Sequence, residues 1–300
     1  MASLDRRHLM SNRQQIFDAL SEMYETRSGD CYELKQSEDR GVYMTATRAV
    51  GKGEVVLIEA PLALMPIHDR REFMQRPDIA AMNQRLNVFS ARYGHLEGAD
   101  KYPPEAQAVM NQREELRAEE YLLTSPNVEK NWKLHDAHRC AEIGNLVMID
   151  GLLSENGRPL NGKKGRVIGE DSRDTQRLEV EIDRGSHEQR ASKSIRQKNL
   201  KTLGGIIRTN SFVFGDLHSA LFETLSRANH ACGESANITK ADYAGRAYVV
   251  AKRDIRAGEE ILIDYLVGDP VDEHRVPLLQ LKYNFECQCP EHHNAYDDVD

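Results

Sequence analysis

The chain has 300 residues, of which 40% are hydrophobic, and its formal net charge is -8 at pH 7. This length suits one large domain or two modest ones with a real core, and the negative charge argues against a general nucleic-acid binder. We find no apolar run long enough to span a bilayer and no apolar segment after Arg6 and Arg7, so we expect no membrane contact, no signal peptide and a cytoplasmic and/or nuclear location. The cysteine count is 5, an odd number that favours thiolate ligands in a reducing compartment over a disulfide framework.

The first part of the chain predicts a helix followed by strands. Residues 11–27 carry apolar side chains at helical spacing, so we assign an N-terminal helix to the segment 1–30. Alternating and β-branched residues predict strands at 43–47 and 54–59, within a β segment that spans 31–66.

The segment 67–145 is charged and rich in helix-forming residues, which predicts a helical insertion. His135 and His138 are three residues apart near its end. Because no further ligands have an evident spacing, we interpret them as ordinary helix residues. We interpret the neighbouring Cys140 as a buried thiol.

The composition changes at 146–203, where two Asn-Gly pairs signal hairpins and short strands are predicted at 165–169, 178–182 and 194–196. This segment resembles a small SH3-like barrel. A solvated barrel surface explains its basic residues most simply, and a docking surface for an acidic partner or nucleic acid is the alternative. The basic residues are Lys163, Lys164, Arg166, Arg190, Lys193, Arg196 and Lys198.

The segment 204–268 returns to a β pattern, and 269–300 forms the end of the chain. We predict a strand-like run over 206–214, a short helix around 219–227, and strands at 247–251 and 260–265. A helix over about 271–281 then leads into Cys287-Gln288-Cys289. Cysteines two apart can both turn onto one metal ion, and an imidazole also serves zinc well.

Five motifs in a fixed order resemble the SET-domain lysine methyltransferases, in particular a SMYD-like SET and post-SET core without a MYND finger. Each motif alone is weak evidence for this resemblance, but five motifs in this order are specific to the family. The motifs are Arg40-Gly41, Asn210-Ser211-Phe212, Asn229-His230-Ala231-Cys232, the segment from Gly258-Glu259-Glu260 to Tyr265, and the segment from Tyr283-Asn284-Phe285 to Cys289.

The resemblance implies an α+β, β-rich fold. It consists of a pseudoknotted SET core with a helical insertion, an SH3-like barrel insertion and a zinc-binding post-SET segment. It also implies transfer of a methyl group from S-adenosylmethionine to the ε-amine of a lysine in a histone or non-histone protein. The alternative is a weak or inactive SET scaffold that binds partners through the barrel. Two departures motivate that alternative, namely Asp39 in place of the first glycine of Gly-x-Gly and a longer link after Cys232. The substrate, the degree of methylation and the oligomeric state stay open.

The resemblance also assigns roles to individual residues. Phe212, Tyr265 and Tyr283 would form the lysine channel, with Tyr265 orienting the amine. Zinc would be held by Cys232, Cys287, Cys289 and His292, with His293 as the fallback ligand. Cofactor contacts are expected from Arg40, Gly41, Asn210, Asn229, His230, Tyr265 and Phe285.

Overall fold

The computed structural model describes residues 31–37, 40–67, 71–93, 103–182, 191–215, 217–266, 272–287 and 289. The chain forms two compact units. Unit 1 contains residues 1–61, 224–271 and 288–300, and unit 2 contains 62–223 and 272–287. The helix predicted over 11–27 lies outside the described residues, as do Asp39, Arg190, His292 and His293.

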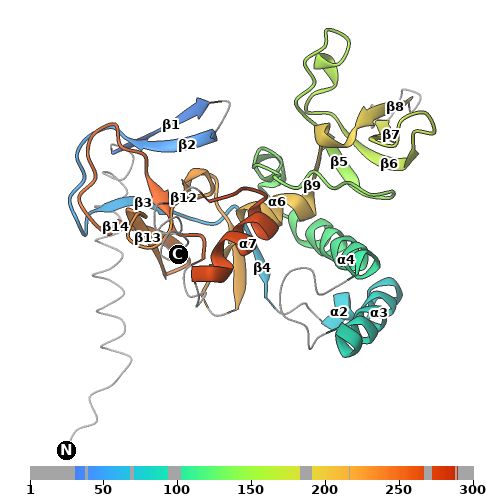
Figure 1. Ribbon diagram of the computed structural model, residues 1–300, viewed down its shortest axis with the longest axis horizontal. Helices are drawn as coiled ribbons and strands as arrows, with labels where there is room; N and C mark the ends of the chain where they lie inside the picture. The colour runs from blue at the N-terminus through green and yellow to red at the C-terminus, as the bar shows by residue number, and fades with distance from the viewer. Residues whose placement is uncertain are drawn as a thin grey trace, which may run out of the picture. The chain divides into compact units, whose positions relative to one another are not determined.

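Unit 1 holds a hairpin and a five-stranded sheet (Figure 1). The hairpin pairs β1 (Tyr32–Ser37) with β2 (Gly41–Ala46), which confirms the first predicted strand. The sheet has the order β12-β15-β13-β14-β3. Its strands are β3 (Val55–Glu59), β12 (Asn229–His230), β13 (Ile238–Tyr243), β14 (Arg246–Ala251) and β15 (Leu262–Ile263).

The short strands β12 and β15 pair in parallel, with Asn229 opposite Leu262 and His230 opposite Ile263. β12 lies at the edge of the sheet. Residues 258–261 run beside β2, because Gly258 N donates to Ala46 O at 2.7 Å and Ile261 N donates to Met44 O at 2.9 Å. Backbone pairing therefore connects three of the predicted motifs in one unit.

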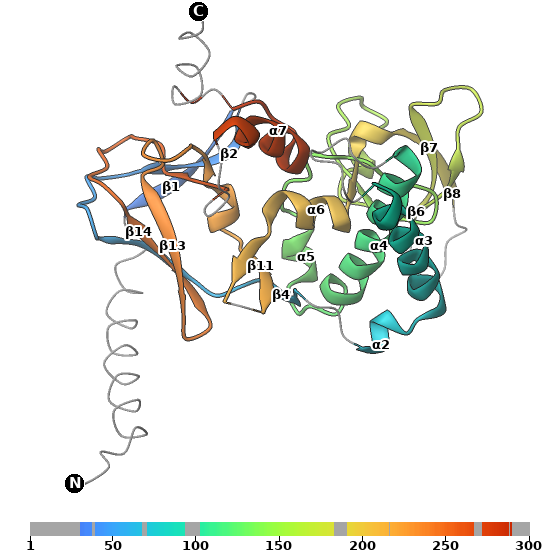
Figure 2. The same ribbon diagram turned by 60° about the horizontal axis from the view of Figure 1, so that its bottom comes forward.

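Unit 2 combines helices with a three-stranded sheet and a five-stranded sheet (Figures 1 and 2). The three-stranded sheet has the order β10-β11-β4, with Trp132 buried in the adjoining core. The elements are β4 (Ala63–Pro66), α2 (Arg71–Met74), α3 (Pro77–Tyr93), α4 (Pro104–Leu122), α5 (Val128–Asn131), α6 (Leu203–Asn210), β10 (Phe212–Phe214), β11 (His218–Leu221) and α7 (Asp272–Tyr283).

Three secondary-structure predictions are wrong. The run predicted as a strand over 206–214 is mostly the helix α6, and only its last three residues form β10. The helix predicted around 219–227 is replaced by β11 and a single 3-10 turn over Leu225–Arg227. His135 and His138 lie in an irregular segment that follows α5, so they are not helix residues.

Buried carboxylates explain why α6 begins where it does. Glu115 accepts the N–H groups of Leu203 and Gly204, at 2.9 and 2.6 Å. Asp136 accepts Thr202 N at 2.9 Å. The first N–H groups of a helix have no partner within the helix, so these oxygens satisfy donors that would otherwise be buried without one. A side chain at Gly204 would place a Cβ 2.4 Å from Glu115, so the glycine lets the carboxylate approach the backbone. Burial raises the pKa of Glu115 to about 7, and the two N–H bonds offset only part of that effect.

The segment 146–202 forms an antiparallel five-stranded sheet with the order β8-β7-β6-β5-β9 and its own core (Figure 1). A 3-10 turn over Gln197–Asn199 precedes the last strand. All three strands predicted in this segment are confirmed. The strands are β5 (Leu146–Ile149), β6 (Lys164–Glu170), β7 (Arg177–Ile182), β8 (Ala191–Arg196) and β9 (Leu200–Thr202).

Within the described part of the chain, no helix is both long enough and apolar enough to cross a membrane.

Candidate functional site

Tyr265 is hydrogen-bonded, through both its hydroxyl and its backbone N–H, to the segment that carries the Asn-His motif. Its hydroxyl donates to Ala228 O at 2.7 Å, and its backbone N–H donates to His230 Nδ1 at 3.1 Å. The rings of Tyr265 and His230 lie 5.1 Å apart. The parallel pairing of β12 with β15 sets these distances, since Tyr265 follows β15 by two residues. Tyr265 is therefore held in one orientation beside the motif.

The Arg40 guanidinium and the Asn229 amide meet at one carboxylate. Arg40 donates to Glu260 Oε2 at 2.6 Å, and Asn229 Nδ2 donates to Glu260 Oε1 at 2.8 Å. Glu260 is 16% exposed, whereas Arg40 is 53% exposed. Gly41, next to Arg40, has φ of 65°, a left-handed conformation that glycine adopts without strain. Three predicted cofactor residues thus lie in one unit, and Glu260 connects two of them.

Glu259 supports the turn that precedes this segment. Its carboxylate accepts Arg253 Nη1 at 2.7 Å and the backbone N–H of Arg256 at 2.9 Å. Burial by itself would raise the pKa of Glu259, but these bonds outweigh burial and lower that pKa. Glu259 therefore stays ionised and fixes the turn, while Glu260 faces Arg40.

Sequence reasoning missed Asn237. This residue is fully buried. Its Nδ2 donates to Glu260 O at 2.7 Å, and its Oδ1 accepts Leu262 N at 2.8 Å. A buried amide needs partners for both of its ends. Asn237 therefore fixes the backbone on either side of Ile261. In the sequence Asn237 stands between Ala236 and Ile238 in a mostly polar stretch, and its partners lie more than twenty residues away.

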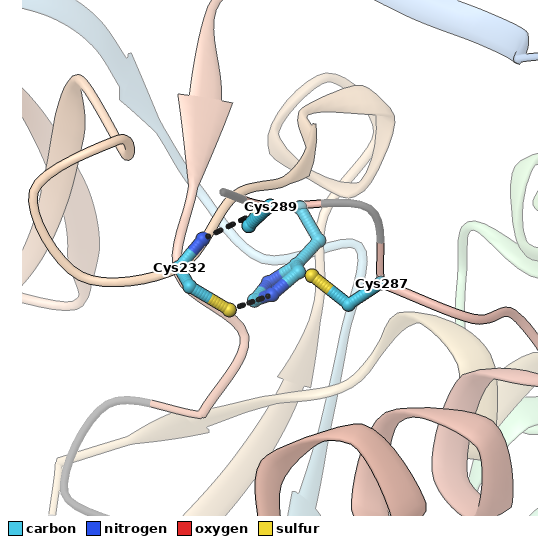
Figure 3. A group of neighbouring side chains, drawn as sticks. Cys232, Cys287 and Cys289 are labelled. Carbon is cyan, nitrogen blue, oxygen red and sulfur yellow. Dashed lines mark hydrogen bonds between the residues drawn. The ribbon is translucent and has the colours of Figure 1, made fainter. Parts of the chain in front are cut away.

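Four candidate ligands gather at the end of β12, and Figure 3 labels the three cysteines among them. Ligand atoms of His230, Cys232, Cys287 and Cys289 all lie within 4.8 Å of one another. His230 Nε2 lies 3.0 Å from Cys232 Sγ, and Cys232 N donates to Cys289 Sγ at 3.3 Å. Two sulfurs at about 2.3 Å from a tetrahedral zinc ion would be about 3.8 Å apart. The three predicted thiol ligands are therefore close enough to converge on one ion.

The other predicted site residues belong to unit 2. Asn210 ends α6, and its Nδ2 donates to the carbonyls of His135 and Ile206 at 2.6 and 2.7 Å. Phe212 packs edge-on against Phe222 with centroids 5.9 Å apart. The rings of Tyr283 and Phe285 lie 6.4 Å apart. These bonds give Asn210 a structural role within its unit. Its predicted cofactor contact and the roles predicted for the three rings stay predictions.

Comparison with known proteins identifies the family. A histone-lysine N-methyltransferase, SET5 of Meyerozyma guilliermondii, is 31% identical over 81 residues, which cover 26% of this chain and 17% of that protein. The crystal structure of the SET domain of LSMT bound to lysine and AdoHcy is similar at a TM-score of 0.35 and 10% identity. That likeness covers 86% of this chain and 53% of the solved chain, and it is too weak to bear on activity. The chain thus spans well under two thirds of either relative. The SET domain family itself matches residues 40–266, which is more than half of the chain, and the protein therefore belongs to the SET-domain family.

Proposed function

We propose that this protein transfers a methyl group from S-adenosylmethionine to the ε-amine of a lysine in a protein substrate, either a histone or a non-histone protein. The cofactor supplies an electrophilic methyl bound to a sulfonium sulfur. The protein has to hold a neutral amine in line with that methyl, so its contribution is positioning and electrostatics. Burial of the amine in an apolar channel lowers the pKa of the lysine and favours the neutral form.

The geometry of Tyr265 carries this proposal. Its hydroxyl proton is directed at Ala228 O. A phenol that donates its proton keeps lone pairs on oxygen, and these can accept an N–H from an incoming amine. Because both the backbone and the hydroxyl of Tyr265 are bonded to the β12 segment, the lone pairs have a fixed direction. A tyrosine with only a packing role needs no such double attachment.

The cofactor would bind beside β12. Asn229 and the backbone of this edge strand can offer donors and acceptors to the amino edge of adenine, because edge strands present such groups. Arg40 would hold the methionine carboxylate through a charge-assisted bond. Glu260 already orients both Arg40 and Asn229. Phe285 would stack on the adenine, and Phe212 and Tyr283 would line the lysine channel with Tyr265.

The donor set fits a structural zinc ion held by three thiolates, Cys232, Cys287 and Cys289. His292, or His293 in its place, would complete a Cys3His site. Such an ion would tie the end of the chain to β12.

The direct test is methylation of protein lysines. Zinc-loaded protein is incubated with histones or cell proteins and S-adenosylmethionine carrying a labelled methyl group, and methyl-lysine is located by mass spectrometry. In Asn229→Asp a second carboxylate faces Glu260, so label incorporation should be lost. Asn156→Asp, in an exposed loop, makes the same change elsewhere and should keep activity. Absence of labelled lysine with the unmodified protein across a broad substrate panel would contradict the proposal.

A second candidate function is partner binding by the 146–202 sheet, which we propose to be an SH3-like barrel. Its strand order and the 3-10 turn before its last strand support that assignment. Lys193, Arg196 and Lys198 are exposed on β8 and the turn that follows. Among the described residues, these three enter no salt bridge, in contrast to Lys164, which pairs with Glu129. An acidic protein segment is the partner that this charge fits.

Charge reversal tests the second function. Lys193→Glu with Arg196→Glu should abolish binding of a poly-glutamate peptide, whereas Lys52→Glu with Arg85→Glu, the same change in net charge at exposed sites, should keep it. If only single-stranded nucleic acid binds in this assay, or if the two variants behave alike, the acidic partner is excluded.

A further inference from the structure

His230 lies among the cysteines, but its hydrogen bonds argue against its being a metal ligand. Its side chain is 1% exposed. Nδ1 accepts the backbone N–H of Tyr265 at 3.1 Å, so Nδ1 carries no proton. In a neutral imidazole the proton must then be on Nε2, the nitrogen that lies 3.0 Å from Cys232 Sγ. A metal ion on Nε2 would require an imidazolate, whereas histidine ligands almost always donate their other ring N–H.

We infer that His230 is a positioning residue that donates Nε2–H to the Cys232 thiolate and thereby couples the cysteine cluster to Tyr265. The metal site itself is the one in the proposed function, and this inference rests on it. A hydrogen bond to a ligating sulfur holds that ligand in place and stabilises its charge. The path runs from Cys232 Sγ through the imidazole to the N–H of Tyr265, within unit 1. The fourth metal ligand must then come from outside the four clustered residues.

The carboxylate beside the ring, Asp264, is hydrogen-bonded elsewhere. An oxygen of the Asp264 carboxylate lies 4.0 Å from Nδ1, beyond hydrogen-bond distance. The two Asp264 oxygens instead accept the backbone N–H groups of Leu266 and Gly233, at 2.9 and 3.1 Å. Asp264 therefore orders the turn around Tyr265 and leaves Nδ1 to the tyrosine N–H. The His230 ring is therefore held at Nδ1 by Tyr265 and at Nε2 by Cys232.

Two amide substitutions of His230 test its two hydrogen bonds separately, the one to Cys232 and the one from Tyr265. In His230→Gln the side-chain amide can reach the position of Nε2 and keep the donor to Cys232. In His230→Asn the shorter amide oxygen can take the place of Nδ1 and keep the acceptor for Tyr265. We expect His230→Gln to bind Zn²⁺ nearly as tightly as the unmodified protein, and His230→Asn to bind about 10–100-fold more weakly, the usual effect of losing such a supporting bond. Both variants should retain one metal ion per chain. If His230 were a ligand, both substitutions would remove it and weaken Zn²⁺ binding alike.

Spectroscopy on the unmodified full chain tests the assignment without any variant. In protein labelled with ¹⁵N-histidine and loaded with ¹¹³Cd²⁺, His230 Nε2 should carry a proton and show no coupling to cadmium. A ¹¹³Cd–¹⁵N coupling to His230 would overturn the inference. Hydrogen exchange tests the coupling, because the Tyr265 amide should lose protection when Zn²⁺ is removed and also in His230→Gln. An unchanged Tyr265 amide after metal removal would refute the path. None of these measurements uses S-adenosylmethionine, so failure of the methyltransferase proposal would be seen separately.

Discussion

Replacement of Tyr265 by phenylalanine removes one hydroxyl and keeps the ring. The bond to Ala228 O at 2.7 Å is lost, while the backbone bond to His230 and the ring contact at 5.1 Å can remain. Loss of one neutral hydrogen bond costs about 1 kcal/mol of unfolding free energy. In a protein of this size that lowers Tm by about 2–4 °C. The variant should therefore fold and bind S-adenosylmethionine with a nearly unchanged Kd.

The rate of methyl transfer should change far more than stability. If the hydroxyl orients the amine, its removal should slow single-turnover transfer to a lysine substrate by about 10²–10³-fold, the usual loss for a single preorganised polar group. Tyr243→Phe is the matched control. It removes the same hydroxyl from β13 and leaves the ring 6.3 Å from Tyr248. A Tyr265→Phe rate within a factor of about two of the control would show that Tyr265 is only structural.

Three further predictions concern stability and metal content. Burial raises the pKa of Glu115 to about 7, so the unfolded chain loses this proton first as pH rises. Stability from Glu115 is therefore present below pH 4.5 and is lost by about pH 7. Glu115→Gln should reduce the fall in unfolding free energy between pH 5 and pH 8 by about 2–3 kcal/mol in denaturant titrations. Gly205→Ala would place a Cβ 2.3 Å from Asp136 Oδ1 and should cost about 3 kcal/mol, whereas Gly169→Ala has open space and should change stability by less than about 0.5 kcal/mol. An equal effect of the two alanines would contradict the packing at α6. Cys289→Ser should abolish stoichiometric zinc in elemental analysis, whereas Cys31→Ser should keep it, since the Cys31 thiol bonds to Val56 O.

Local patterns predicted the strands well and α6 badly. The run from Ile206 to Phe214 contains β-branched and aromatic residues that favour a strand. The helix forms because Thr202 caps it and because Glu115 and Asp136 satisfy its first N–H groups. Those carboxylates are 66 to 89 residues away in sequence. The spacing of Leu203, Ile206, Ile207 and Asn210 was a helical signal in the sequence.

The candidate site was also predicted only in part from the sequence. The motifs predicted that Arg40, Asn229, His230 and Tyr265 belong to one functional site, and unit 1 contains all four. The sequence could not show how they are connected. The role of Glu260 depends on a bond to Arg40 across 220 residues. The direction of the His230 ring depends on a backbone N–H 35 residues later. Such contacts exist only after the strands have paired.

Calorimetric titration of S-adenosylmethionine into the zinc-loaded full chain tests the central claim most directly. We expect saturable binding at one site per chain, weakened in Asn229→Asp and kept in Tyr265→Phe. Absence of binding by folded, zinc-containing protein would contradict the claim that this SET domain is a methyltransferase, and would leave partner binding through the 146–202 sheet as its function.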